Sequence, residues 1–136
     1  MIKQYEITLP SLGRGYHLIT RIIEKSIEEM PEKGLLNILL KHTSAAITMN
    51  ENADPSVRED FEAFFNRLAP ENASYFTHVL EGSDDMPAHL KSSILGQDIT
   101  IPISNKKLNM GTWQGIYYCE FRNHSSRRKI VLTVYS

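Results

Sequence analysis

The sequence predicts an α/β protein of the α+β type: a single compact domain, residues 1–136, with about three helices covering a mixed or antiparallel β-sheet or sandwich. Two observations favour this fold class. Several segments alternate apolar and polar residues as half-buried strands do, whereas others repeat apolar residues at helical spacing. In addition, the last strand-like segments follow one another without helices between them, which is typical of antiparallel pairing.

The composition is that of an ordinary globular protein, with 41% hydrophobic and 23% charged residues. Because 15 Lys and Arg residues stand against 16 Asp and Glu, we expect neither nucleic acid nor a membrane surface as a partner. The N-terminus lacks the apolar core of a signal peptide, and no segment approaches the about 20 apolar residues of a membrane span. With Cys119 as the single cysteine, no intrachain disulfide is possible, so we expect a cytoplasmic location. We interpret Cys119 as a packing residue.

The first half of the chain predicts strand, helix, strand. Residues 2–9 alternate as a strand, and after a Gly-Arg-Gly turn the apolar residues of 18–30 fall at helical spacing until Pro31 and Gly34 end the pattern. The apolar run 35–40 predicts a central strand covered on both faces.

The second half begins with an extended segment, 45–49, followed by a helix that Asp54 caps and Pro55 starts, ending near Pro70. Residues 71–85 are polar and without a period, and a loop of this length favours a functional role. Pro87 can start a third, short helix closed by Gly96. The remaining strands are expected at 99–103, 111–121 and 129–135.

Three histidines, His42, His78 and His89, lie beside small polar residues or acids. Imidazole is a common metal ligand and can act as acid or base near neutral pH. Their spacing matches no known metal motif, so surface or otherwise satisfied histidines are the alternative interpretation. Asp85 lies four residues before His89, which would place both on one side of a helix, where a carboxylate can orient the imidazole or share a cation. An equal alternative is that Asp85 only stabilises the helix N-terminus as an acid there.

The segment 111–121 has polar side chains on one of its two faces. Period two places Gln114 and Glu120 on the face opposite Tyr117 and Cys119. We expect one face to be core, and polar groups buried on the other would need a ligand, a metal or another subunit as partner. A solvated face is the alternative.

Basic residues beside hydroxyl groups favour phosphate binding, because Arg supplies forked donors and Lys a compact charge. Arg127 and Arg128 form a basic run with Lys129, and Lys91 precedes two serines. A solvated hairpin end commonly looks the same. No Walker loop or GxGxxG motif supports a nucleotide site.

Three segments resemble the signature blocks of the YjbQ family of secondary thiamine-phosphate synthase-like proteins: HTSAAITMNE at 42–51, DDMPAHLKSSILG at 84–96, and GTWQG at 111–115. The resemblance spans nearly the whole chain. It implies a small α/β fold assembled as a homotrimer, a polar pocket containing histidines, and a weak thiamine-phosphate synthase activity. The sequence Ser83-Asp84-Asp85 departs from the Asp-Gly-Asn-like sequence of many relatives, which leaves the role of Asp85 open.

Matched to the family blocks, the residues predict a transferase that joins a pyrimidine methyl diphosphate to a thiazole phosphate at a site holding a divalent metal ion, zinc or magnesium. The expected metal ligands are His42, His78 and His89. The expected catalytic residues are Asp85, Gln114 and Glu120. The residues expected to bind the small phosphorylated substrate are Ser44, Lys91, Arg127 and Arg128. Two alternatives are a metal-dependent hydrolase and a non-catalytic trimeric ligand-binding protein.

Overall fold

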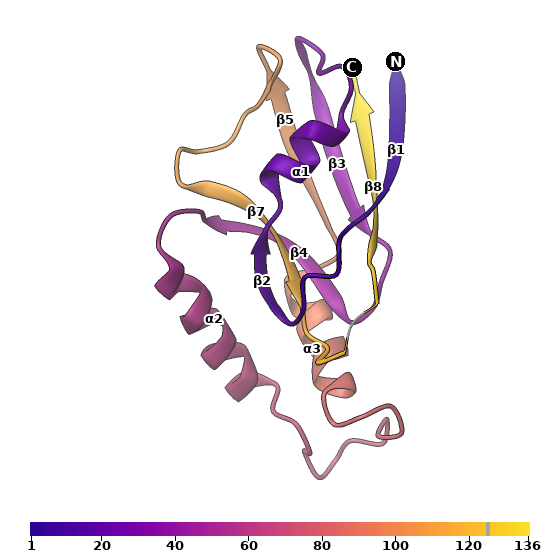
Figure 1. Cartoon of the computed structure of the whole chain (residues 1–136), viewed down its shortest axis with the longest axis vertical. Helices are drawn as coiled ribbons and strands as arrows, with labels where there is room; N and C mark the ends of the chain where they lie inside the picture. Colours follow the sequence, from indigo (N-terminus) through magenta and orange to yellow (C-terminus); the bar gives the residue numbers. More distant parts are fainter. Residues whose placement is uncertain (125) are drawn as a thin grey trace.

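The computed structural model describes residues 1–124 and 126–136, which form two antiparallel sheets and three helices (Figure 1). The larger sheet contains, in order, β1 (Ile2–Thr8), β8 (Lys129–Tyr135), β3 (Lys33–Leu40), β5 (Asp98–Ser104) and β6 (Lys107–Leu108). The smaller sheet contains β2 (Gly15–Leu18), β7 (Gln114–Glu120) and β4 (Ala45–Glu51). The helices are α1 (Thr20–Ser26), α2 (Pro55–Leu68) and α3 (Asp85–Leu95). Every strand pair among the described residues is antiparallel, which confirms the α+β prediction and decides against a mixed sheet.

The main hydrophobic core joins the inner faces of the two sheets to α1. The inward residues of β3, Leu36 and Ile38, are fully buried there together with Ile116 and Tyr118 of β7. Full burial of an aliphatic or aromatic side chain stabilises the fold by roughly 1.5–3 kcal/mol. These contacts account for the packing of the two sheets.

A second, smaller core lies on the other face of the smaller sheet. Tyr117, Cys119 and Phe121 pack there against Phe61 and Phe65 of α2. Strand β7 is therefore buried on both faces. The sequence predicted a single core face, with the polar side chains on the opposite one, whereas the face of Glu120 also carries Ile116 and Tyr118 of the main core. Burial raises the pKa of the Cys119 thiol, in agreement with its interpretation as a packing residue.

The first helix is shorter than its apolar pattern predicts, because α1 begins at Thr20 and ends at Ser26, whereas the pattern runs over residues 18–30. Residues 15–18 form β2, pairing with β7 from Gly15 opposite Glu120 to Leu18 opposite Tyr117. This pairing supplies backbone hydrogen bonds along a free edge of β7 and buries Tyr16 in the second core. The helical apolar pattern begins at Leu18, two residues before α1, but strand pairing with β7 holds Leu18 in an extended conformation. His17 lies in the same strand.

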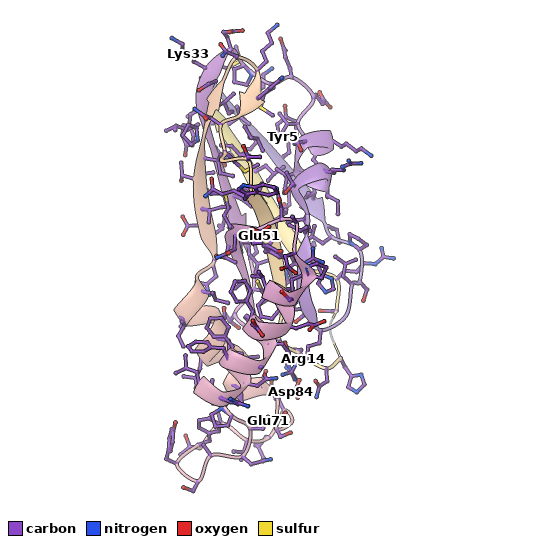
Figure 2. All side chains as sticks on the ribbon, turned by 90° about the vertical axis from the view of Figure 1, so that its left-hand side faces the viewer. Tyr5, Arg14, Lys33, Glu51, Glu71 and Asp84 are labelled. Carbon is purple, nitrogen blue, oxygen red and sulfur yellow. The ribbon has the colours of Figure 1, made fainter. Side chains whose placement is uncertain are left out.

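The sequence predicts one end of each of the helices α2 and α3. Asp54 caps α2 through Ser56 N at 2.9 Å, and Gly96 ends α3, as the sequence predicts. Helix α3 begins at Asp85, before Pro87, because proline is tolerated throughout a first helical turn. Figure 2 shows the connecting loop, labelled at Glu71 and Asp84, at the end of the molecule opposite Lys33. Among the described helices, none has the length and apolar character to cross a membrane.

Candidate metal centre

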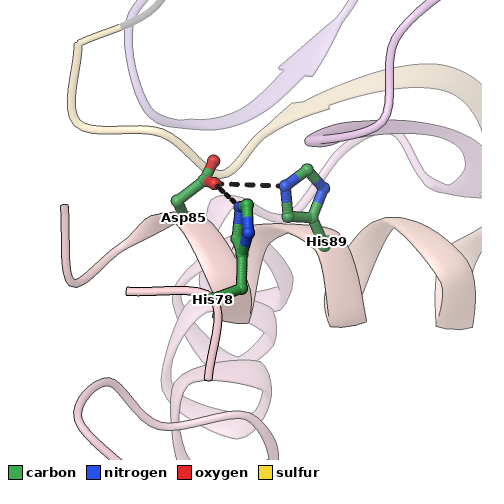
Figure 3. A group of neighbouring side chains, drawn as sticks. All are labelled: His78, Asp85 and His89. Carbon is green, nitrogen blue, oxygen red and sulfur yellow. Dashed lines mark hydrogen bonds and ion pairs between the residues drawn. The ribbon is translucent and has the colours of Figure 1, made fainter. Parts of the chain in front are cut away.

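Two histidines and one aspartate converge where the loop between α2 and α3 meets the first turns of α3 (Figure 3). Asp85 Oδ2 lies 2.7 Å from His78 Nε2 and 3.1 Å from His89 Nε2. The helix places Asp85 and His89 on one side because they are four residues apart, and the loop returns His78 to the same carboxylate. Only 1% of Asp85 is exposed. The three ligand atoms lie within 4.8 Å of one another, so one ion could contact all three.

The carboxylate of Asp85 is fixed from its other side by an arginine. Arg122 Nη1 donates to Asp85 Oδ1 at 2.5 Å, and Arg122 Nε donates to Asp84 Oδ2 at 2.9 Å. Arg122 also donates to the carbonyl oxygen of Glu81. Because Arg122 follows β7 directly, this fork ties the start of α3 to the smaller sheet. Burial alone would raise the pKa of Asp85, but the hydrogen bond with His78 and the charges of His89 and Arg122 lower it.

The hydrogen bonds of His89 define which of its nitrogens can bind a cation. His89 Nδ1 lies 2.8 Å from the carbonyl oxygen of Thr43. A carbonyl only accepts, so Nδ1 carries the hydrogen and, in the neutral ring, Nε2 presents its lone pair. That lone pair faces the Asp85 carboxylate, an arrangement that requires a proton or a cation between them. A ligating histidine held through its other nitrogen by a carbonyl is the usual arrangement around protein-bound metals.

The third predicted ligand, His42, lies outside this group of ligand atoms. Its Nε2 accepts a hydrogen bond from the backbone N–H of Lys129 at 2.8 Å. His42 and His89 nevertheless line one groove of about 530 Å³. The structure therefore brings His78 and His89 together with Asp85 and places His42 beside them.

Glu120, predicted to be catalytic, and Arg128, predicted to bind substrate, form a buried ion pair. Arg128 Nε and Nη2 donate to the two carboxylate oxygens of Glu120 at 2.8 and 2.6 Å, and Nη2 also donates to Ser44 Oγ at 3.0 Å. Burial alone would raise the pKa of Glu120, but the Arg128 hydrogen bonds and that of Tyr118 lower it. In this geometry the two charges are paired with each other, and Ser44 accepts from Arg128.

The other predicted site residues lie apart from the cluster. Lys91 is 2% exposed and donates to Asn66 Oδ1 at 2.7 Å, on the side of α3 that faces α2. Gln114 begins β7, roughly 20 Å along the strand from Glu120, and accepts from the backbone N–H of Gly111. Arg127 is exposed just before β8.

Sequence reasoning missed two features of the centre, Arg122 and the Thr43 carbonyl. Arg122 could have been noticed as a cation just after a buried strand, in a chain with two adjacent acids at 84 and 85. Nothing in the sequence, however, indicates that Arg122 contacts those acids. Thr43 contributes a backbone oxygen, and residue type gives no information about such a contact.

Comparison with known proteins identifies the family to which these segments belong. The model of the UPF0047 protein YjbQ-like family matches residues 5–136. This chain belongs to the YjbQ family. It is 47% identical to a UPF0047 protein YjbQ of Escherichia coli O157:H7 and 49% identical to that of Salmonella typhimurium, in each case over 96% of both chains.

The fold of this YjbQ-family chain also resembles solved structures. A conserved hypothetical protein of Thermus thermophilus superposes with a TM-score of 0.82 at 30% identity, covering 93% of this chain and 97% of that one. The names of these relatives state no reaction. In the family blocks, Thr43 of the first block contacts His89 of the second, whereas Gln114 of the third lies at the far end of β7.

Proposed function

We propose that this YjbQ-family protein binds a divalent transition-metal ion through His78, Asp85 and His89 and acts there on a small phosphorylated substrate. The observation that supports this most directly is that His89 Nε2 lies 3.1 Å from Asp85 Oδ2 while Thr43 holds the other nitrogen of the ring. His78 Nε2 faces the same oxygen. A cation at this point would satisfy all three atoms.

The donor set favours zinc over magnesium. Two imidazoles and one carboxylate are a known zinc set that leaves a position open, whereas magnesium prefers oxygen ligands and retained waters. When bound, such an ion acts as a Lewis acid that stabilises charge on a phosphate oxygen. Two further residues hold the ligands in place. Arg122 fixes one oxygen of Asp85, and the carbonyl oxygen of Thr43 fixes the imidazole of His89.

For the reaction, we propose the thiamine-phosphate synthase-like transfer that the family resemblance implies. The C–O bond to the diphosphate breaks with its electron pair on the departing oxygen, and the thiazole nitrogen forms the new bond to carbon. This step needs cationic groups near the leaving group and no strong base. The groove beside His89 offers the cation of Lys41 for that purpose, and the ring of His42 lines the same groove.

A hydrolase needs a general base that activates water, and a carboxylate is one class of side chain that can serve. Both candidate carboxylates are engaged: Asp85 by two histidines and Arg122, and Glu120 by Arg128. A non-catalytic binding protein predicts instead that His42→Ala and His89→Ala change the oligomer mass while metal content stays unchanged.

Elemental analysis of the purified protein tests the metal. We expect close to one zinc or similar ion per chain, lost in His89→Ala and His78→Ala and retained in His17→Ala. His17 is a matched control because it lies on β2 and contacts the carbonyl oxygen of Gly13. Equal metal content in all four proteins would sink the proposed centre.

The reaction is tested separately, by incubating the metal-loaded protein with the pyrimidine methyl diphosphate and the thiazole phosphate. We expect thiamine phosphate and diphosphate in equal amounts. Diphosphate release without the thiazole would indicate hydrolysis. Absence of thiamine phosphate, with or without added metal, refutes the transferase while leaving the metal result standing.

A further inference from the structure

The ring of His42 is held in one orientation by the backbone of β8. The N–H of Lys129 donates to His42 Nε2 at 2.8 Å. An amide N–H can only donate, so Nε2 bears no hydrogen, and the neutral ring carries its hydrogen on Nδ1. A nitrogen whose lone pair is used in this way cannot also give that lone pair to a metal ion. His42 therefore offers its surroundings a donor, Nδ1–H.

The same short segment is held at two further points. Thr43 accepts from His89 through its carbonyl, and Ser44 accepts from the buried guanidinium of Arg128. Three successive residues are thus anchored by β8, by α3 and by the Glu120–Arg128 pair. Such anchoring from several sides holds a donor in place before a ligand arrives, which reduces the entropic cost of binding.

The groove in front of His42 suits an anion. Its volume, about 530 Å³, matches a small-molecule site, and its polar lining includes Lys41, Ser93 and Gln97 as well as His89. Lys41 pairs with Glu6 at 2.7 Å, but both side chains are about half exposed, so this pair is weak and can be exchanged.

The local field around His42 is positive. Burial lowers the pKa of His42, and the charges of Arg128, Lys129 and Lys41 lower it further against the opposing effect of Glu120. The ring therefore stays neutral near neutral pH and remains a donor at its Nδ1 position. An anion entering the groove that His42 lines would meet a net positive potential.

We propose that His42 is a substrate-binding residue rather than a metal ligand, and that its Nδ1–H donates to a phosphate group held in the groove that Lys41 and Ser93 line. The inference rests on the proposed function in one respect, because the groove shares His89 with the metal centre. It assigns the histidine of the first family block to the substrate and the other two histidines to the ion.

Nitrogen-15 NMR of the whole protein tests the tautomer directly. We expect His42 to show a protonated Nδ1 and an unprotonated Nε2 at pH 7.5. A hydrogen on Nε2, or a shift of either nitrogen when zinc is added that parallels the shift at His89, would overturn the proposal. This measurement needs neither substrate nor activity.

Phosphate titration of the protein as purified, followed by phosphorus-31 NMR, tests the binding role with a matched pair of variants. His42→Gln keeps an acceptor for Lys129 N–H but has no donor at the δ position, whereas His42→Asn keeps the donor and loses the acceptor. Since a hydrogen bond to a charged group contributes about 1.5–3 kcal/mol, we expect His42→Gln to weaken phosphate binding about ten- to hundredfold. His42→Asn should bind more tightly than His42→Gln and melt at a lower temperature.

Metal content, measured on the same samples, separates the two proposals. We expect His42→Gln to keep the metal content of the wild type. Loss of metal in His42→Gln to the extent seen in His89→Ala would show that His42 is a ligand and overturn the inference. Unchanged phosphate affinity in His42→Gln would also overturn it. If the wild type binds no metal, the proposed centre fails, while the phosphate comparison still decides the role of His42. Ser93→Ala, at an exposed position in the groove lining, gives a second test: we expect weaker phosphate binding, and unchanged binding would contradict a contact with Ser93.

Discussion

Replacing Glu120 by glutamine tests whether the ion pair in the smaller sheet stabilises the fold or serves the substrate. Glu120 is fully buried, and its partner Arg128 is 6% exposed. Glutamine keeps the shape and one oxygen acceptor but removes the charge. Arg128 would then remain buried with its charge uncompensated.

The expected cost is set by this uncompensated charge. Breaking a buried ion pair from one side typically costs 3–5 kcal/mol. Because the glutamine oxygen still accepts one hydrogen bond and Ser44 Oγ accepts another from Arg128 Nη2, we expect the lower end, about 3 kcal/mol. For a chain of 136 residues this corresponds to a fall of roughly 10 °C in melting temperature.

Urea denaturation of the wild type, Glu120→Gln, Arg128→Met and the double variant measures this cost. We expect each single change to be strongly destabilising and the double variant to be less destabilised than the sum, by about 1–3 kcal/mol, because the two residues act as one unit. Single effects below about 1 kcal/mol, or additive effects, would refute the structural role and reopen a direct role for Glu120 in catalysis.

The pH dependence has a defined sign. Arg128 and Tyr118 hold the pKa of Glu120 below its ordinary value of 4.5, against the opposing effect of burial. A folded-state pKa below the unfolded one gives a stabilisation that is fully present above about pH 4.5 and is lost as the pH falls through the folded-state value. The difference in unfolding free energy between wild type and Glu120→Gln should therefore shrink on acidification below pH 4.5. A difference that grows there would contradict the assignment.

Three further predictions concern other parts of the molecule. Asp85→Asn should abolish metal binding by elemental analysis yet leave a folded protein, because Arg122 keeps its contact with Asp84; retention of metal would contradict the centre. We predict a homotrimer by light scattering, with Leu35→Asp reducing the mass, since Leu35 is 45% exposed on the outer face of the larger sheet; an unchanged mass would exclude that face. Native Cys119 should resist a thiol reagent at pH 8 until urea unfolds the chain, because burial raises its pKa; rapid reaction would indicate local opening.

Local patterns in the sequence were sufficient for several elements and for one pair in the site. The cap at Asp54, the proline at 55 and the terminal Gly96 predicted helix ends correctly, since such residues satisfy backbone groups of their own segment. The four-residue spacing of Asp85 and His89 predicted their common side of a helix for the same reason. Each of these interactions lies within one turn or one segment, where spacing alone decides geometry.

Contacts between distant segments could not be predicted in this way. The edge of β7 turned residues 15–18 into a strand, although the helical apolar pattern already begins at Leu18. The end of β7 brought Arg122 to Asp85, and the backbone N–H of Lys129 donates to Nε2 of His42, one of the three histidines that the family resemblance predicts as metal ligands.

The sequence by itself determined the α+β class, the start of α2, the end of α3 and the residue types that can bind a metal and a phosphate. Only the tertiary structure decided which histidines meet, because His78, Asp85 and His89 converge through a loop closure and a helix turn, whereas His42 depends on a backbone amide from β8. The physical reason is that these contacts depend on how segments far apart in the chain pack together, and the spacing of residues along the sequence gives no information about that packing.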